Sequence, residues 1–164
     1  MTIAALIIFV GFVILGIIKF GWQRSYSAFA SKWTEAVPID DHTHLWSIVT
    51  MVVAFLMAIP MIGSGEGSPW QFLGFFAPVY LGVVALTPEY ETNKRQKVIH
   101  IVGTAVCALA TLLWLGLVVG DWKALVLSFI AAYIVAIVTK TIERSLLFWS
   151  EMAMFAAVFI KLLA

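Results

Sequence analysis

Long apolar runs separated by short polar stretches follow one another along the whole chain. A helix needs about 20 mainly apolar residues to cross the roughly 30 Å hydrocarbon core of a bilayer. Six runs approach that length, and they predict transmembrane helices at approximately residues 2–20, 45–62, 70–86, 98–119, 124–141 and 146–163. The pattern therefore predicts an all-α, polytopic transmembrane helical bundle that forms one integral membrane domain over residues 1–164.

The run at residues 70–86 is the shortest and contains Pro78 near its middle. Proline removes a backbone donor and bends a helix. Gly74, Pro78 and Gly82 recur every four residues, however, and so form a stripe of small residues on which a neighbouring helix can pack closely. We expect a kinked, tightly packed span.

The connection between the first two runs, residues 21–44, has a helical pattern of its own. One face collects its apolar residues, and the other positions carry polar ones; the apolar set is Tyr26, Phe29, Ala30, Trp33 and Val37. This pattern is typical of an amphipathic helix that lies in the membrane interface. We expect such a helix between spans one and two, ending at Pro38.

Composition agrees with a lipid environment. The chain is 63% hydrophobic and 12% charged, whereas soluble domains are about 45–50% apolar and about 25% charged. Membrane lipids are therefore the expected partners. A net charge of +1 without a clustered basic face argues against a nucleic-acid partner, and the single cysteine, Cys107, excludes a disulfide within the chain.

The basic residues predict the orientation, because short cytoplasmic loops are enriched in them. Eight of the ten lie at the ends of the first, third and fifth runs or in the connections that follow them: Lys19, Arg24, Lys32, Lys94, Arg95, Lys97, Lys140 and Arg144. Both termini should then lie on the non-cytoplasmic side, and the compact chain suggests a bacterial cytoplasmic (inner) membrane. Five tryptophans near the ends of the runs fit a belt at headgroup depth: Trp22, Trp46, Trp70, Trp122 and Trp149.

Ionisable side chains inside an apolar span are costly, so each is a candidate functional residue. Glu151, about a turn and a half inside the last run, is the strongest. It could handle a proton or a substrate, or form a buried structural pair with Lys140, Arg144 or His100. A small, weakly polar face in the fourth run should point into the bundle; its residues are His100, Gly103, Thr104, Cys107 and Thr111.

The predicted topology also brings every histidine to one side of the membrane. Imidazoles with nearby carboxylates can hold zinc and lower the pKa of a bound water to about 7. The metal-ligand candidates are His42, His44, His100 and Asp40, and the catalytic candidates are Glu151, His100 and Asp41. The simpler interpretation is that these residues lie at the polar headgroup boundary and that the aspartates cap the second helix. A cofactor is therefore expected only in the zinc alternative.

Three short motifs carry a resemblance: Ser25 to Ala28, the Trp46-led second run, and Val98 to Gly103. In these, the chain resembles small six-helix bacterial membrane proteins of uncharacterised function, with a layout distantly similar to the DRAM-type family. That resemblance implies topology and no catalytic residue. The chain also shares residue types with the ceramidase and adiponectin-receptor-like zinc hydrolases, but it lacks their seventh helix and the paired histidines on it.

Three functions remain open. The first and favoured one is a multi-pass membrane protein without enzymatic activity that acts through lipid or protein contacts; it predicts a filled bundle in which Glu151 is paired. The second is a small transporter or channel, which could act as a homo-oligomer, with Glu151 and the small polar face lining a cavity. The third is a zinc-dependent membrane hydrolase that uses the histidine cluster.

Overall fold

The computed structural model describes residues 1–36 and 44–164. Within these ranges the ordered structure is helical, as the apolar runs predicted. The elements are α1 (Thr2–Phe20), α2 (Phe29–Ala36), α3 (Leu45–Gly63), α4 (Phe72–Ala85), α5 (Lys94–Leu113), the π-helical turn η1 (Trp114–Val118), α6 (Trp122–Val138) and α7 (Ile142–Leu163).

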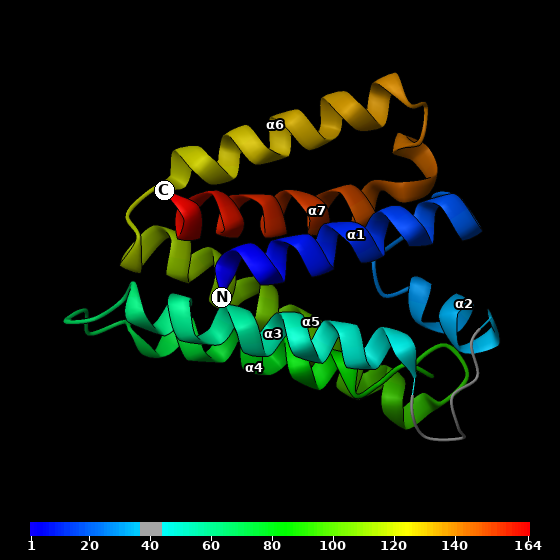
Figure 1. The fold of residues 1–164 in the computed structure, drawn as a ribbon, viewed down its shortest axis with the longest axis horizontal. Coiled ribbons are helices and arrows are strands. Elements are labelled where there is room, and N and C mark those ends of the chain that lie inside the picture. Colours follow the sequence, from blue (N-terminus) through cyan, green and yellow to red (C-terminus); the bar gives the residue numbers. More distant parts are fainter. Residues whose placement is uncertain (37–43) are drawn as a thin grey trace.

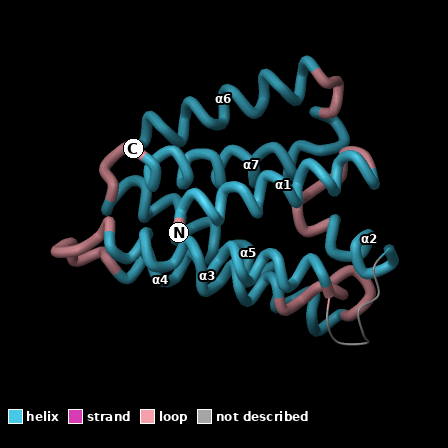
Figure 2. The backbone as a smooth tube through the Cα atoms, viewed as in Figure 1, coloured by secondary structure: helices cyan, strands magenta, loops and turns pink. Residues whose placement is uncertain are grey.

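The longer helices run alternately in opposite directions, with short connections at two ends of the bundle (Figures 1 and 2). Helices α3, α4 and α5 pack side by side as one layer, and α6 and α7 form a hairpin on the other side. Helix α1 lies between these two groups and contacts both α3 and α7. Direct contact between α5 and α7 is sparse, and this seam is where the pocket described below is found.

In the described part of the chain, four helices are long and apolar enough to cross a membrane: α1, α3, the continuous α5–η1 helix and α7. Helices α4 and α6 are apolar but shorter, with 14 and 17 residues. Large aliphatic side chains cover the outside of the bundle, as illustrated by Ile18 and Val138, which are 76% and 75% exposed. A continuous apolar exterior of this kind is unusual for a soluble monomer, so the fold supports a membrane protein.

The small-residue stripe on α4 packs against α3, as its spacing predicted. A Cβ atom added to Gly74 would lie only 2.5 Å from the carbonyl oxygen of Met61, and one on Gly82 would lie 3.2 Å from the sulfur of Met51. Pro78 is buried, and α4 continues through it. The glycines therefore allow the α3 and α4 backbones to approach more closely than side chains would permit.

Two helix boundaries differ from the hydropathy pattern. Helix α5 begins at Lys94, four residues before the apolar run, because Asn93 caps it by accepting hydrogen bonds from the amides of Arg95 (3.0 Å) and Gln96 (3.2 Å). Helix α7 begins at Ile142 and has a kink at Ser145, whose φ and ψ are −131° and 28°. Capping by Asn93, which hydropathy does not report, moves the start of α5 outward. At the start of α7, Thr141 makes no side-chain capping hydrogen bond.

The expected tryptophan belt is only partly present. Trp22, Trp70 and Trp122 are exposed, whereas Trp46 and Trp149 are buried inside the protein. The prediction was wrong for these two, because aromatic neighbours and a protein acceptor cover them. The ring of Trp46 lies 5.7 Å from that of Tyr26, for example, and the Trp149 indole donates to Thr141 Oγ1 at 2.9 Å.

A short helix, α2, occupies the connection in which an amphipathic helix was expected. It buries Phe29, Ala30 and Trp33. Trp33 stacks on Phe12 of α1 at 5.1 Å, and the ring of Phe29 lies where a side chain on Gly16 would otherwise be. The apolar face of α2 is therefore held against the bundle; Tyr26 precedes the helix, and Val37 and Pro38 lie outside the described residues.

Candidate functional site

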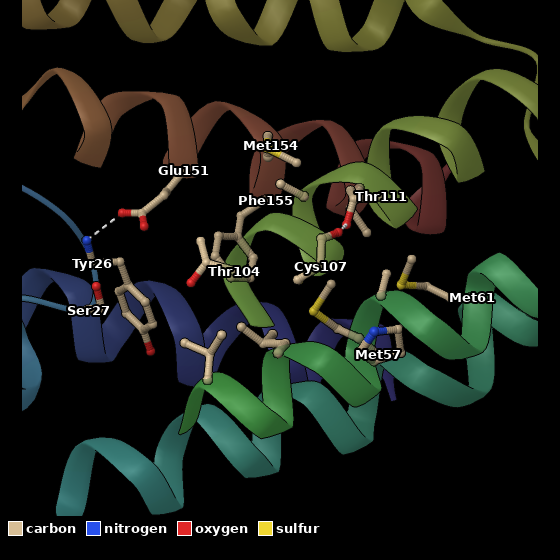
Figure 3. A pocket seen from close by; sticks show the side chains of 16 residues that line it. Tyr26, Ser27, Met57, Met61, Thr104, Cys107, Thr111, Glu151, Met154 and Phe155 are labelled. Carbon is tan, nitrogen blue, oxygen red and sulfur yellow. Dashed lines mark hydrogen bonds between the residues drawn. The ribbon is translucent and has the colours of Figure 1, made fainter. Parts of the chain in front are cut away.

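A pocket of about 90 Å³ lies in the seam between the two groups of helices. Its sixteen lining residues come from α3, α4, α5, α7 and the connection between α1 and α2 (Figure 3). Most of them are apolar, and Glu151 is the one carboxylate among them. Three of the five residues on the predicted polar face of α5 also contribute: Thr104, Cys107 and Thr111.

Two hydrogen bonds position Glu151 through the α1–α2 connection. The kink at Ser145 prevents the Phe148 amide from reaching its usual acceptor one turn earlier, and this N–H donates instead to the Arg24 carbonyl at 3.0 Å. One turn further along α7, the Tyr26 amide donates to Glu151 Oε2 at 2.6 Å. The connection thus runs beside the first turns of α7 and holds the carboxylate at the pocket wall (Figure 3).

Glu151 has no cationic partner among the residues that the structure describes. The ion pairs there join Arg24 to Glu91, Lys32 to Glu35 and Lys161 to Asp121. The expected structural pair of Glu151 with Lys140, Arg144 or His100 is therefore wrong within residues 1–36 and 44–164. A backbone amide takes the place of the cation, and neither hydropathy nor charge spacing reports such a donor.

The residues around this amide are buried, including Ser25 and Ser27 on either side of Tyr26. Their hydroxyl groups lie 3.1 Å apart, and Ser25 Oγ accepts the Ala28 amide at 3.1 Å. The Tyr26 hydroxyl shares a hydrogen bond with Thr50 Oγ1 at 2.9 Å, and burial raises the pKa of this phenol above its usual range. The turn therefore presents a neutral, fully engaged tyrosine beside Glu151.

The polar face of α5 points into the bundle, as predicted, but its residues divide between two environments. His100 and Gly103 are buried, and a Cβ on Gly103 would lie 3.2 Å from Val84 of α4. Thr111 donates to the Cys107 carbonyl at 2.8 Å. Thr104 Oγ1 is buried at the pocket and has no hydrogen-bond partner in the described part of the chain, so it offers a free donor and acceptor there.

Both described histidines are held by threonines. Thr87 donates its hydroxyl proton to the Val84 carbonyl at 2.7 Å, so the 2.8 Å contact with His100 Nδ1 requires an Nδ1–H donor on the imidazole. His100 also stacks on Tyr90 at 3.9 Å. Thr34, which donates to the Ala30 carbonyl, holds His44 Nδ1 in the same way at 3.1 Å. The first hydrogen bond joins the α4–α5 connection to α5, and the second joins the residue before α3 to α2.

The described residues do not assemble the predicted zinc cluster. No group of three or more histidine, cysteine, aspartate or glutamate side chains within them is arranged to hold a metal ion. His44 and His100 use one ring nitrogen each on different threonines. The other candidates, Asp40, Asp41 and His42, lie outside the described residues.

A second, larger hollow of about 610 Å³ opens beside α2 and the α4–α5 connection. Its charged residues have both signs, and the Arg24–Glu91 ion pair closes one side of it. The Glu91 carboxylate raises the pKa of Arg24 above its usual value. Among the described lining residues, charges of both signs largely compensate one another, and none is an unpaired group comparable to Glu151.

Comparisons with protein families, with curated proteins and with solved structures found no match to this chain.

Proposed function

We propose that the protein is a six-span integral membrane protein that acts as a small transporter, with Glu151 as the solute-binding group in the pocket. The six antiparallel helices support the six-span topology. Helix α4 packs between α3 and α5, and α6 packs against α7; these three neighbours are long and apolar enough to span a bilayer. The proposed membrane is the bacterial cytoplasmic membrane, and α2 lies in its interface.

The orientation follows from the distribution of charge. The α1–α2, α4–α5 and α6–α7 connections, in or beside which eight of the ten basic residues occur, lie at one end of the bundle, and the α3–α4 and η1–α6 connections lie at the other (Figure 1). An excess of lysine and arginine favours the cytoplasmic side. Both termini are therefore proposed to face away from the cytoplasm.

One observation carries the transporter proposal: a carboxylate inside an apolar bundle borders a pocket and has a single backbone donor among the described residues. A membrane-embedded charge is costly, so it persists where it serves a substrate or ion path. A protein that acts only through its outer surface needs neither the carboxylate nor the pocket. A zinc hydrolase needs a ligand cluster, for which the described histidines offer no support.

Cys107 allows a direct test, because it is the only cysteine and it lines the pocket. A transporter opens its binding site to each side of the membrane in turn. We therefore expect membrane-impermeant methanethiosulfonates to modify Cys107 when they are added to either side of sealed, oriented vesicles. Cys107→Ser supplies the unlabelled control. Absence of reaction from both sides, or reaction from one side alone, would contradict transport.

A further inference from the structure

We infer that the pocket selects small organic cations, in particular the head of an alkylammonium compound, over neutral and anionic solutes of the same size. This inference rests on the proposed function, because it assigns the solute class of the same pocket. It goes beyond that function by naming the charge and the size of the group that Glu151 receives.

The charges of the pocket-lining residues favour a cation. Among the pocket-lining residues that the structure describes, there is no lysine, arginine or histidine, so nothing there attracts an anion. Glu151 has one hydrogen bond, from the Tyr26 amide to Oε2, and the other carboxylate oxygen has no partner in the described ranges. In a medium of low dielectric constant, a carboxylate in this state favours a nearby positive charge or a proton.

The remaining wall suits an organic cation better than a hydrated metal ion. Met57, Met61 and Met154 contribute thioether groups, and the rings of Tyr26 and Phe155, 6.0 Å apart, border the same space. Aromatic faces attract ammonium groups, and methionine fills irregular apolar space around them. A hydrated inorganic ion would need several oxygen ligands to replace its water, which this wall does not supply.

The volume of the pocket limits the size of the group that it can hold. A volume of about 90 Å³ is smaller than the roughly 150 Å³ of an engineered cavity that binds benzene. The pocket therefore favours small heads, such as a primary alkylammonium or a trimethylammonium group, over larger ones. The Thr104 hydroxyl, which has no partner in the described chain, is available to accept a hydrogen bond from a primary ammonium or to bind water.

The experiment compares two reagents that deliver opposite charges to Cys107. Trimethylammonioethyl methanethiosulfonate is a cation, and sulfonatoethyl methanethiosulfonate is an anion with the same reactive group. The rate of each reagent at Cys107 is measured in detergent-solubilised protein. It is divided by the rate of the same reagent at an exposed reference cysteine, which is supplied by the double variant Glu66→Cys, Cys107→Ser, because Glu66 is exposed in the loop of residues 64–71. We expect the normalised cation rate to exceed the anion rate by about tenfold or more.

Glu151→Gln tests the origin of this preference. Its amide oxygen can still accept the Tyr26 N–H, so the fold should persist, and the elution volume and thermal unfolding of the variant check this. The cation preference should fall to near unity. The inference would be overturned if the cation-to-anion rate ratio were unchanged in Glu151→Gln, or if the two rates were equal in the wild type; the pocket would still be accessible in both cases. If neither reagent modified Cys107, the proposed function itself would be contradicted.

Protection provides a second measurement that does not depend on the variant. Tetramethylammonium should slow the modification of Cys107 by an uncharged methanethiosulfonate, and tert-butanol, a neutral molecule of similar size, should not at the same concentration. Equal protection by both compounds would show a pocket that selects size alone, and it would refute the assignment to cations.

Discussion

The close approach of the α3 and α4 backbones at Gly74 gives a sharp test of how the pocket is built. In Gly74→Ala the new methyl group would lie 2.5 Å from the Met61 carbonyl oxygen and 2.8 Å from its carbonyl carbon. Ordinary contact begins at 3.4 Å, so α4 must move about 0.9 Å away from α3 at this point. Backbone atoms cannot rotate aside as a side chain can.

The expected cost follows from two opposing terms. Overpacking of this kind costs about 1–3 kcal/mol, and replacing glycine by alanine inside a helix returns about 0.5–1 kcal/mol. We therefore expect Gly74→Ala to lower the free energy of unfolding by about 0–2.5 kcal/mol. Gly11→Ala is the matched control, because Gly11 is inside α1 and a Cβ there meets nothing within 4 Å; it should stabilise by about 0.5–1 kcal/mol.

Unfolding of both variants by dodecyl sulfate in mixed micelles, followed by circular dichroism, measures this difference. The separation of α3 and α4 should also accelerate the modification of Cys107, because Met57 and Met61 of α3 and Ala77 of α4 line the pocket. Equal stabilities for Gly74→Ala and Gly11→Ala would refute the close approach of the two backbones. If Gly74→Ala is destabilised but Cys107 reacts at an unchanged rate, the two backbones do pack closely, but their separation does not control access to the pocket.

Three further outcomes are expected. Gly116→Ala places a methyl group 1.9 Å from the Trp122 ring and should cost about 1–3 kcal/mol; adding Trp122→Ala should recover part of this in the same unfolding assay. His100→Ala removes a hydrogen bond and an aromatic stack, so it should lower stability by about 1–3 kcal/mol, and elemental analysis should find its metal content equal to that of the wild type. The hydrogen bond from the Lys161 ammonium holds the pKa of the Asp121 carboxyl below its usual range, and the backbone amides that Asp121 caps lower this pKa further. The resulting stability is present above the unfolded-state pKa and is lost as the pH falls through the folded-state pKa, so Lys161→Met should flatten the acid side of a plot of melting temperature against pH.

Much of the helical framework could be predicted because it depends on local hydrophobicity. The runs at residues 2–20 and 45–62 correspond closely to α1 and α3. The four-residue repeat of Gly74, Pro78 and Gly82 correctly predicted a close packing face, since side chains four apart share one side of a helix. Boundaries set by capping were less accessible, and the hydropathy pattern started α5 four residues late.

The candidate site was only partly predictable. Glu151 was identified by its depth in an apolar run, and Thr104, Cys107 and Thr111 by their helical spacing. Its partner was not identified, because the donor is the Tyr26 backbone amide, 125 residues away in the chain. Side-chain charges along the sequence give no information about backbone donors that tertiary packing brings close.

The sequence by itself determined an apolar, helical, membrane-type protein, because the free energy of transfer to lipid depends on composition within each run. It also determined which faces of α4 and α5 would be buried, since these follow from helical periodicity. Only the tertiary structure decided that the α1–α2 connection packs along α7, that the described histidines bind threonines, and that a space remains beside Glu151. Such features depend on contacts between residues far apart in the chain, and no local pattern of side chains encodes them.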